Sequence, residues 1–116
     1  MQYMLLIYGD ETADAAQDGA QQQATMVAYQ AFTEGVIAQG KFKSADRLHP
    51  ATTATTVRVQ NGKTLATDGP FAETREQLGG YYIVDATDLD DAIAIAARIP
   101  GAKTGCVEVR PVFVFS

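Results

Sequence analysis

The chain has 116 residues, a length at which one hydrophobic core is self-sufficient, so we expect a single domain spanning residues 1–116. Hydrophobic residues make up 47% and charged residues 20%, which is typical of a soluble globular protein. The net charge is -5, and the nine Lys and Arg residues form no patch, which disfavours nucleic acid as a partner.

The first residues, MQYMLLIYGDE, predict a strand rather than a targeting segment. They lack the basic start, the sustained apolar stretch and the small-residue cleavage site of a secretory signal. No segment reaches the run of about 18 apolar residues that a membrane helix requires. We therefore expect a cytoplasmic protein that does not associate with a membrane.

The first half of the chain predicts a strand, a helix and a short strand. Residues 2–8 form a strand whose side chains are apolar on both faces, so each face needs a cover. Residues 20–39 predict a helix with one apolar arc that rests on the sheet, and Gly40 is its C-terminal stop. Residues 41–48 predict a short edge strand that its charges protect from further pairing.

The segment TTVRVQNGKTLATD carries the clearest local signal, a hairpin closed by Asn61 and Gly62. Asn-Gly is the preferred type I′ turn because both central residues need positive φ. A two-residue loop sets the register, with the pairs Gln60–Lys63, Val59–Thr64, Arg58–Leu65, Val57–Ala66 and Thr55–Asp68. Asp68 then shares a face with Val57 and Val59, at the edge of an apolar surface.

The second half of the chain predicts a strand, a helix and a last strand. Residues 79–86 are apolar on both faces and predict another central strand. The segment DATDLDDAIAIAARIPG predicts a helix that begins at Thr87 or Asp88 and ends before Pro100. The last strand lies in GCVEVRPVFVFS, where Pro111 indicates an edge position or a bulge.

Two features that suggest chemistry have simpler structural explanations. Helix caps and favourable charges at a helix N-terminus explain the aspartates at 85, 88, 90 and 91 better than a metal does. The single cysteine, Cys106, is interpreted as a core residue of the last strand. No Ser-His-Asp order, Cys-His pair, phosphate-binding glycine loop or metal-ligand spacing is present, so we predict neither a metal nor a cofactor.

The predicted elements follow the order strand, helix, short strand, hairpin, strand, helix, strand. This order indicates an α+β fold, ferredoxin-like with an inserted β-hairpin. Two helices cover one face of such a sheet, yet the strands at 2–8 and 79–86 are apolar on both faces. The simplest cover for the second face is the sheet of another copy, which predicts a homodimer built as a dimeric α/β barrel.

Residues 67–82, TDGPFAETREQLGGYY, closely resemble the signature of the YCII-related, or DGPF-domain, family of small bacterial proteins. The resemblance also covers YMLLIYGDE near the start, ATTVR at 54–58 and VEVRPV near the end. It implies a ferredoxin-like α+β fold, dimerisation through the sheets and a pocket near the tetrad at 68–71.

The resemblance does not imply one settled activity. Some relatives are suspected small-molecule enzymes, and many are encoded beside extracytoplasmic-function sigma factors. We therefore expect a small-molecule-binding protein or an acid/base enzyme with its pocket near the tetrad. The alternative is a non-catalytic interaction or regulatory protein linked to such a sigma factor.

The tetrad has a structural and a functional interpretation. In the structural one, Asp68 accepts hydrogen bonds within the turn, Gly69 adopts unusual φ/ψ, and Phe71 anchors a short helix in the core. In the functional one, Asp68 lies on an apolar face, where desolvation raises the pKa of a carboxyl group toward the range of acid/base catalysis, with Gly69 and Phe71 beside the ligand. Arg75 and Glu76 then supply an anion-binding charge and a second carboxylate, although a nearby Arg75 would lower the pKa of Asp68.

Three further side chains are candidates for the site. Members of the wider superfamily are thought to use an Asp–His pair, and His49 is the single histidine here. It lies just before Pro50, so it is either a second catalytic residue or an exposed loop residue. Tyr8 and Tyr82 are candidates for orienting a ligand, and packing is their alternative role.

Overall fold

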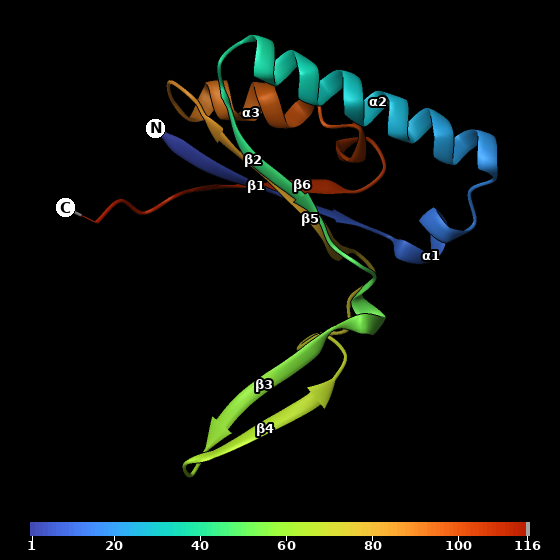
Figure 1. Cartoon of the computed structure of the whole chain (residues 1–116), viewed down its shortest axis with the longest axis vertical. Coiled ribbons are helices and arrows are strands. Elements are labelled where there is room, and N and C mark those ends of the chain that lie inside the picture. The colour runs from blue at the N-terminus through green and yellow to red at the C-terminus, as the bar shows by residue number, and fades with distance from the viewer. Residues whose placement is uncertain (116) are drawn as a thin grey trace.

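The computed structural model describes residues 1–115, which contain six strands, three α-helices and two short 3-10 helices (Figure 1). The strands are β1 (Gln2–Gly9), β2 (Phe42–Arg47), β3 (Thr55–Gln60), β4 (Lys63–Asp68), β5 (Gln77–Asp85) and β6 (Cys106–Pro111). The α-helices are α1 (Glu11–Ala15), α2 (Gly19–Ala38) and α3 (Leu89–Ala97), and two short 3-10 helices are η1 (Ala51–Thr53) and η2 (Pro100–Ala102).

Four strands form one antiparallel sheet with the order β2-β5-β1-β6. Strands β3 and β4 pair only with each other, as a hairpin between β2 and β5. This is an α+β arrangement, as predicted, and its strand order is consistent with a ferredoxin-like fold. The predicted central positions of β1 and β5 and the edge position of β2 are confirmed, and β6 is an edge strand, as Pro111 indicated.

Helices α2 and α3 pack side by side on one face of the sheet, and the core lies between them and the strands (Figure 1). Tyr82 of β5 is buried there, with its ring edge-on to Phe32 at 5.1 Å between centroids. The Tyr82 hydroxyl lies 2.7 Å from the Thr33 hydroxyl, so its polar end is satisfied inside the core. The largest fully buried side chains are Leu5, Val36, Val84, Ile95 and Ile99.

Side chains at the helix ends explain where the helices begin and stop. Asp88 caps α3 by accepting a hydrogen bond from the Asp91 backbone at 2.8 Å, as predicted. Asp91 pairs with Lys41 at 2.8 Å, and Asp85 pairs with the N-terminal amine at the same distance. Gly40 follows α2 with φ of 73°, a conformation that suits glycine. Three of the four aspartates at 85, 88, 90 and 91 therefore have structural partners.

The opposite face of the sheet carries no helix (Figure 1). Side chains of the two central strands alternate between the faces, so Met4, Leu6, Tyr81 and Ile83 lie on this uncovered side. All four are half-buried rather than fully buried. We call this surface the open face. The open face matches the prediction that both faces of the central strands are apolar. That the sheet of a second copy covers it to form a dimeric barrel stays a prediction.

The register predicted for the hairpin is confirmed at every pair, from Gln60–Lys63 to Thr55–Asp68. Its surroundings differ from the prediction, because the hairpin extends away from the sheet on the side opposite the helices (Figure 1). Val57 and Val59 are 60% and 69% exposed, so the face that they share with Asp68 covers no core in this chain.

Three local predictions are wrong. The short helix predicted at Phe71 does not form, since residues 69–76 are bends and irregular backbone, and Phe71 is 83% exposed instead of anchored in the core. Cys106 is exposed, because it stands on an edge strand opposite Tyr8 of the open face. The short helix α1 was not predicted. Asp10 caps it by accepting hydrogen bonds from the Thr12 and Ala13 backbones.

Candidate functional site

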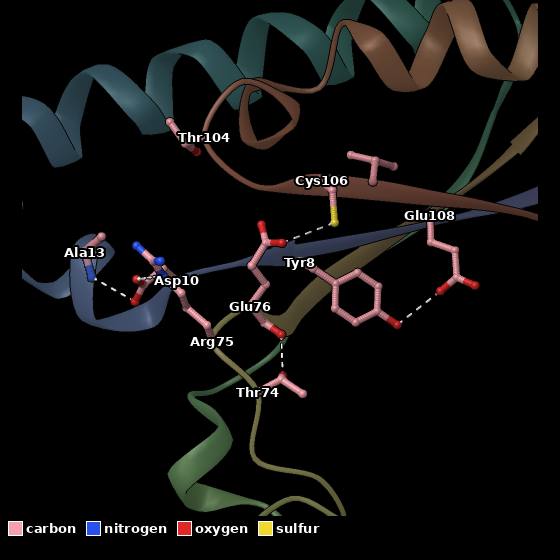
Figure 2. A pocket seen from close by; sticks show the side chains of 10 residues that line it. Tyr8, Asp10, Ala13, Thr74, Arg75, Glu76, Thr104, Cys106 and Glu108 are labelled. Atoms are coloured by element: carbon pink, nitrogen blue, oxygen red, sulfur yellow. Dashed lines mark hydrogen bonds and ion pairs between the residues drawn. The ribbon is translucent and has the colours of Figure 1, made fainter.

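A groove of about 790 Å³ lies where the end of β1, the start of β6 and residues 74–76 meet (Figure 2). Figure 2 shows chemically active side chains from all three segments directed into this groove. They are Tyr8, Asp10, Arg75, Glu76, Cys106 and Glu108. The lining thus combines carboxylates, a guanidinium, a phenol and a thiol within one concave surface.

Antiparallel pairing of β1 with β6 brings the strand residues of the groove together. Tyr8 lies opposite Cys106, and Leu6 lies opposite Glu108. Glycine at position 105 lets the start of β6 approach β1 closely, because a Cβ there would overlap the carbonyl oxygen of Tyr8. The chain therefore needs glycine directly before Cys106 to form this wall of the groove.

The Tyr8 hydroxyl donates a hydrogen bond to Glu108 Oε1 at 3.2 Å. Burial raises the pKa of Tyr8 above its usual value, and the bond to Glu108 raises it further. Glu108 also accepts a bond from Arg110 at 2.6 Å, which holds the pKa of its carboxyl group below the usual range. At neutral pH the phenol is therefore protonated and the carboxylate is charged.

Arg75 and Glu76 enter the groove from the segment that joins the hairpin to β5. Arg75 Nε lies 3.5 Å from Asp10 Oδ2, but its side chain is 90% exposed, so the ion pair holds it weakly. Glu76 Oε1 lies 4.0 Å from the Cys106 Sγ, which is a weak donor. Among residues 1–115 no cation pairs with the Glu76 carboxylate, so it is available to a ligand.

The structure brings three of the predicted site residues together, namely Tyr8, Arg75 and Glu76. Asp68, Gly69 and Phe71 lie at the base of the hairpin and do not line the groove. His49 is exposed in the loop after β2. Tyr82 lies on the helix-covered face, where it packs in the core. The roles predicted for these five residues stay predictions.

Gly69 rather than the Asp68 side chain holds the base of the hairpin. The Gly69 amide donates to the Ala54 carbonyl at 2.7 Å, and Thr56 Oγ1 donates to the Gly69 carbonyl at 2.8 Å. Its φ of 99° is a conformation that side chains rarely adopt. Within residues 1–115 no hydrogen bond reaches the Asp68 carboxylate, so its predicted role as a turn cap has no partner there.

Asp10, Cys106 and Glu108 were missed as site residues. Cys106 and Glu108 come to Tyr8 through the pairing of strands about a hundred positions apart, as the Tyr8–Glu108 bond illustrates. No local pattern signals such a contact. Asp10 carries one usable signal, because an acid directly before a helix is a common cap.

Comparison with known proteins defines the class to which this fold and groove belong. The family model described as YCII-related domain matches residues 1–116. An uncharacterised protein of Rhizobium meliloti (strain 1021) is 38% identical over 117 residues, which cover 99% of this chain and 94% of the relative. The chain therefore belongs to the YCII-related domain family, as the residues around the tetrad predicted.

None of the helices within residues 1–115 is long and apolar enough to cross a membrane. The same described residues contain no group of three or more His, Cys, Asp or Glu side chains placed to hold a metal ion.

Proposed function

We propose that this is a cytoplasmic, homodimeric protein that binds a small polar molecule in the groove and performs acid/base chemistry on it. The observation that carries the proposal is the Glu76 carboxylate, which faces the groove without an ion-pair partner in the described chain, beside Tyr8 and Cys106. A concave site with a few converging polar groups is the usual form of a small-molecule site.

The groove offers distinct chemical roles to its side chains. Glu76 is the acceptor for a proton of the bound molecule, because a carboxylate within hydrogen-bond reach acts as a general base. Tyr8 stays protonated at neutral pH and gives its one O–H to Glu108, so its hydroxyl oxygen accepts a hydrogen bond that orients the molecule. Arg75 is exposed and loosely paired, which leaves its guanidinium able to turn toward a polar group of the ligand.

The open face supports the proposed homodimer. Met4, Leu6, Tyr81 and Ile83 form an apolar strip across the two central strands that no helix covers. Contiguous apolar surface of this kind is characteristic of protein interfaces. A second copy stacked by a twofold axis would cover the same strip on both chains and produce the dimeric α/β barrel.

A thermal-shift screen against a collection of metabolites tests the binding role. A bound molecule stabilises the native state by mass action, so hits raise the melting temperature of the wild type. We expect the hits not to raise the melting temperature of Glu76→Gln. Without a ligand, this variant should melt at the same temperature as the wild type. Glu73→Gln is the matched control, because it removes an exposed carboxylate of the same segment that does not line the groove.

The same screen tests Asp68. If Asp68→Asn keeps the shifts that Glu76→Gln loses, the chemistry belongs to the groove and not to the tetrad. Equal shifts in the wild type and in Glu76→Gln would contradict the assignment of Glu76.

A second candidate function is a non-catalytic interaction protein that acts with a partner such as an extracytoplasmic-function sigma factor. The observation that favours it is the exposure of apolar side chains on both faces of the hairpin and at its base, namely Val57 and Val59 on one face, Leu65 on the other, and Phe71. A screen without hits, together with capture of one defined protein that Val59→Asp abolishes, would support this function over the first.

A further inference from the structure

The β3–β4 hairpin lacks the support that a two-stranded hairpin needs. Its strands pair only with each other, and every residue in them except Thr56 is exposed. An isolated hairpin is only marginally stable in water, because two strands bury too little surface. A surface outside its own chain would therefore stabilise the hairpin.

The hairpin also gives the chain an extended shape. The Cα radius of gyration is 16.2 Å, against about 13 Å for a compact chain of this length. Figure 1 shows the cause, since the hairpin stands away from the sheet on the side of the open face. In this position the β3–β4 hairpin, which we call the arm, can contact a molecule that packs on the open face.

Charge distinguishes the hairpin from the rest of this acidic chain. Arg58 and Lys63 lie on one face of it together with Leu65, and its single acid, Asp68, lies on the other face at its base. The groove has the opposite character, with three carboxylates and one guanidinium among its lining residues. A basic arm and an acidic groove on the same chain are complementary between two copies, and complementary charge fixes the register of an interface.

We infer that the hairpin of one copy lies across the groove of a second copy, where Arg58 and Lys63 meet its carboxylates. The twofold axis of a dimer repeats this contact, so each copy gives one arm and receives one. The site is then composite, because a ligand in the groove is enclosed by the partner's arm. This inference builds on the proposed function by using the same groove, but its test does not depend on any ligand.

Cross-linking between two differently tagged chains tests the inference. One chain carries Gln60→Cys and Cys106→Ser, so its single thiol is at the hairpin tip. The other is the wild type, whose single thiol is Cys106 in the groove. We expect a short bis-maleimide to join the two different chains in the mixed sample.

The matched control places the thiol elsewhere. Gln23→Cys with Cys106→Ser also carries an exposed thiol, on α2 and so on the other side of the sheet. We expect it to join to the wild type at least tenfold more slowly than the hairpin thiol. Equal rates, or products that join only two hairpins, would overturn the inference.

Charge reversal supplies a second test. Arg58→Glu with Lys63→Glu should slow the cross-link at least tenfold and weaken the dimer in sedimentation equilibrium by a similar factor. The conservative exchange Arg58→Lys with Lys63→Arg should keep both near the wild-type values. A wild-type chain that sediments as a monomer at micromolar concentration would overturn both the homodimer and the contact between the hairpin and the groove. Ligand binding in the thermal-shift screen would still be possible in that case, so the two tests fail independently.

Discussion

At the scale of single residues, Gly105 shows how the backbone sets the geometry of the groove. Its Cα approaches the Tyr8 carbonyl too closely for a side chain. Gly105→Ala should lower the free energy of unfolding by about 1–3 kcal/mol, the usual cost of overpacking a close contact. Urea unfolding followed by circular dichroism measures this change.

Gly79→Ala is the control for Gly105→Ala. Gly79 also lies in the sheet, but nothing comes within 4 Å of a Cβ placed there. We expect a far smaller change from this variant. A similar loss in both variants would mean that the cost arises from the removal of glycine itself and not from the contact with Tyr8.

Asp91 makes folding depend on pH. Hydrogen bonds from Lys41 at 2.8 and 2.9 Å hold the pKa of this carboxyl group below its usual value. A carboxyl group with a lowered folded-state pKa stabilises the protein above its unfolded pKa of about 3.9, and the contribution disappears as the pH falls through the folded value. Asp91→Asn should therefore be less stable than the wild type at pH 7, and the gap should close in acid.

The control for Asp91→Asn is Asp90→Asn. Asp90 is exposed in the same first turn of α3, so its replacement changes the helix-end charge without touching Lys41. Thermal unfolding at several pH values compares the variants. A stability gap for Asp91→Asn that stays constant from neutral pH into acid would contradict the role of the Lys41 pair.

At the scale of helices and strands, the features predicted correctly from the sequence are those that neighbouring residues determine. The turn residues Asn61 and Gly62 fixed the register of the hairpin, and Asn61 does adopt a φ of 51°. Asp88 and Gly40 marked helix ends through capping and backbone geometry. Each of these signals involves residues only a few positions apart, so they are readable without knowledge of the fold.

The failures at this scale come from tertiary context. Phe71 and Cys106 have apolar or small side chains that are usually buried, but both stand where this chain supplies no cover. The groove was only partly predicted for the same reason. Arg75 and Glu76 were predicted from their charges shortly after Asp68, whereas Glu108 comes to Tyr8 through strand pairing that no local pattern signals.

The hairpin yields a prediction of its own. Amides of residues 55–68 should exchange slowly with deuterium at concentrations that favour the dimer and quickly after dilution, because an unsupported hairpin opens readily. Amides of β1 and β5 should stay protected at both concentrations, since these strands are central in the sheet. Hairpin exchange that does not change with dilution would mean that the hairpin needs no second copy.

At the scale of the whole molecule, the two faces of the sheet differ in what they contact. The helix-covered face holds the core, whereas the open face carries the apolar strip, and the groove lies at its end. The apolar pattern of the central strands predicted that something covers both faces. The sequence could not show what covers each face, because we propose that the open face is covered by a second copy of the chain.

Nuclear magnetic resonance of the isotope-labelled wild type with a hit from the metabolite screen tests whether the groove is the ligand-binding site. We expect the ligand to shift the amide signals of Tyr8, Arg75, Glu76 and Cys106, which line the groove. Shifts confined to α2, or to the tetrad at 68–71 with the groove signals unmoved, would contradict it.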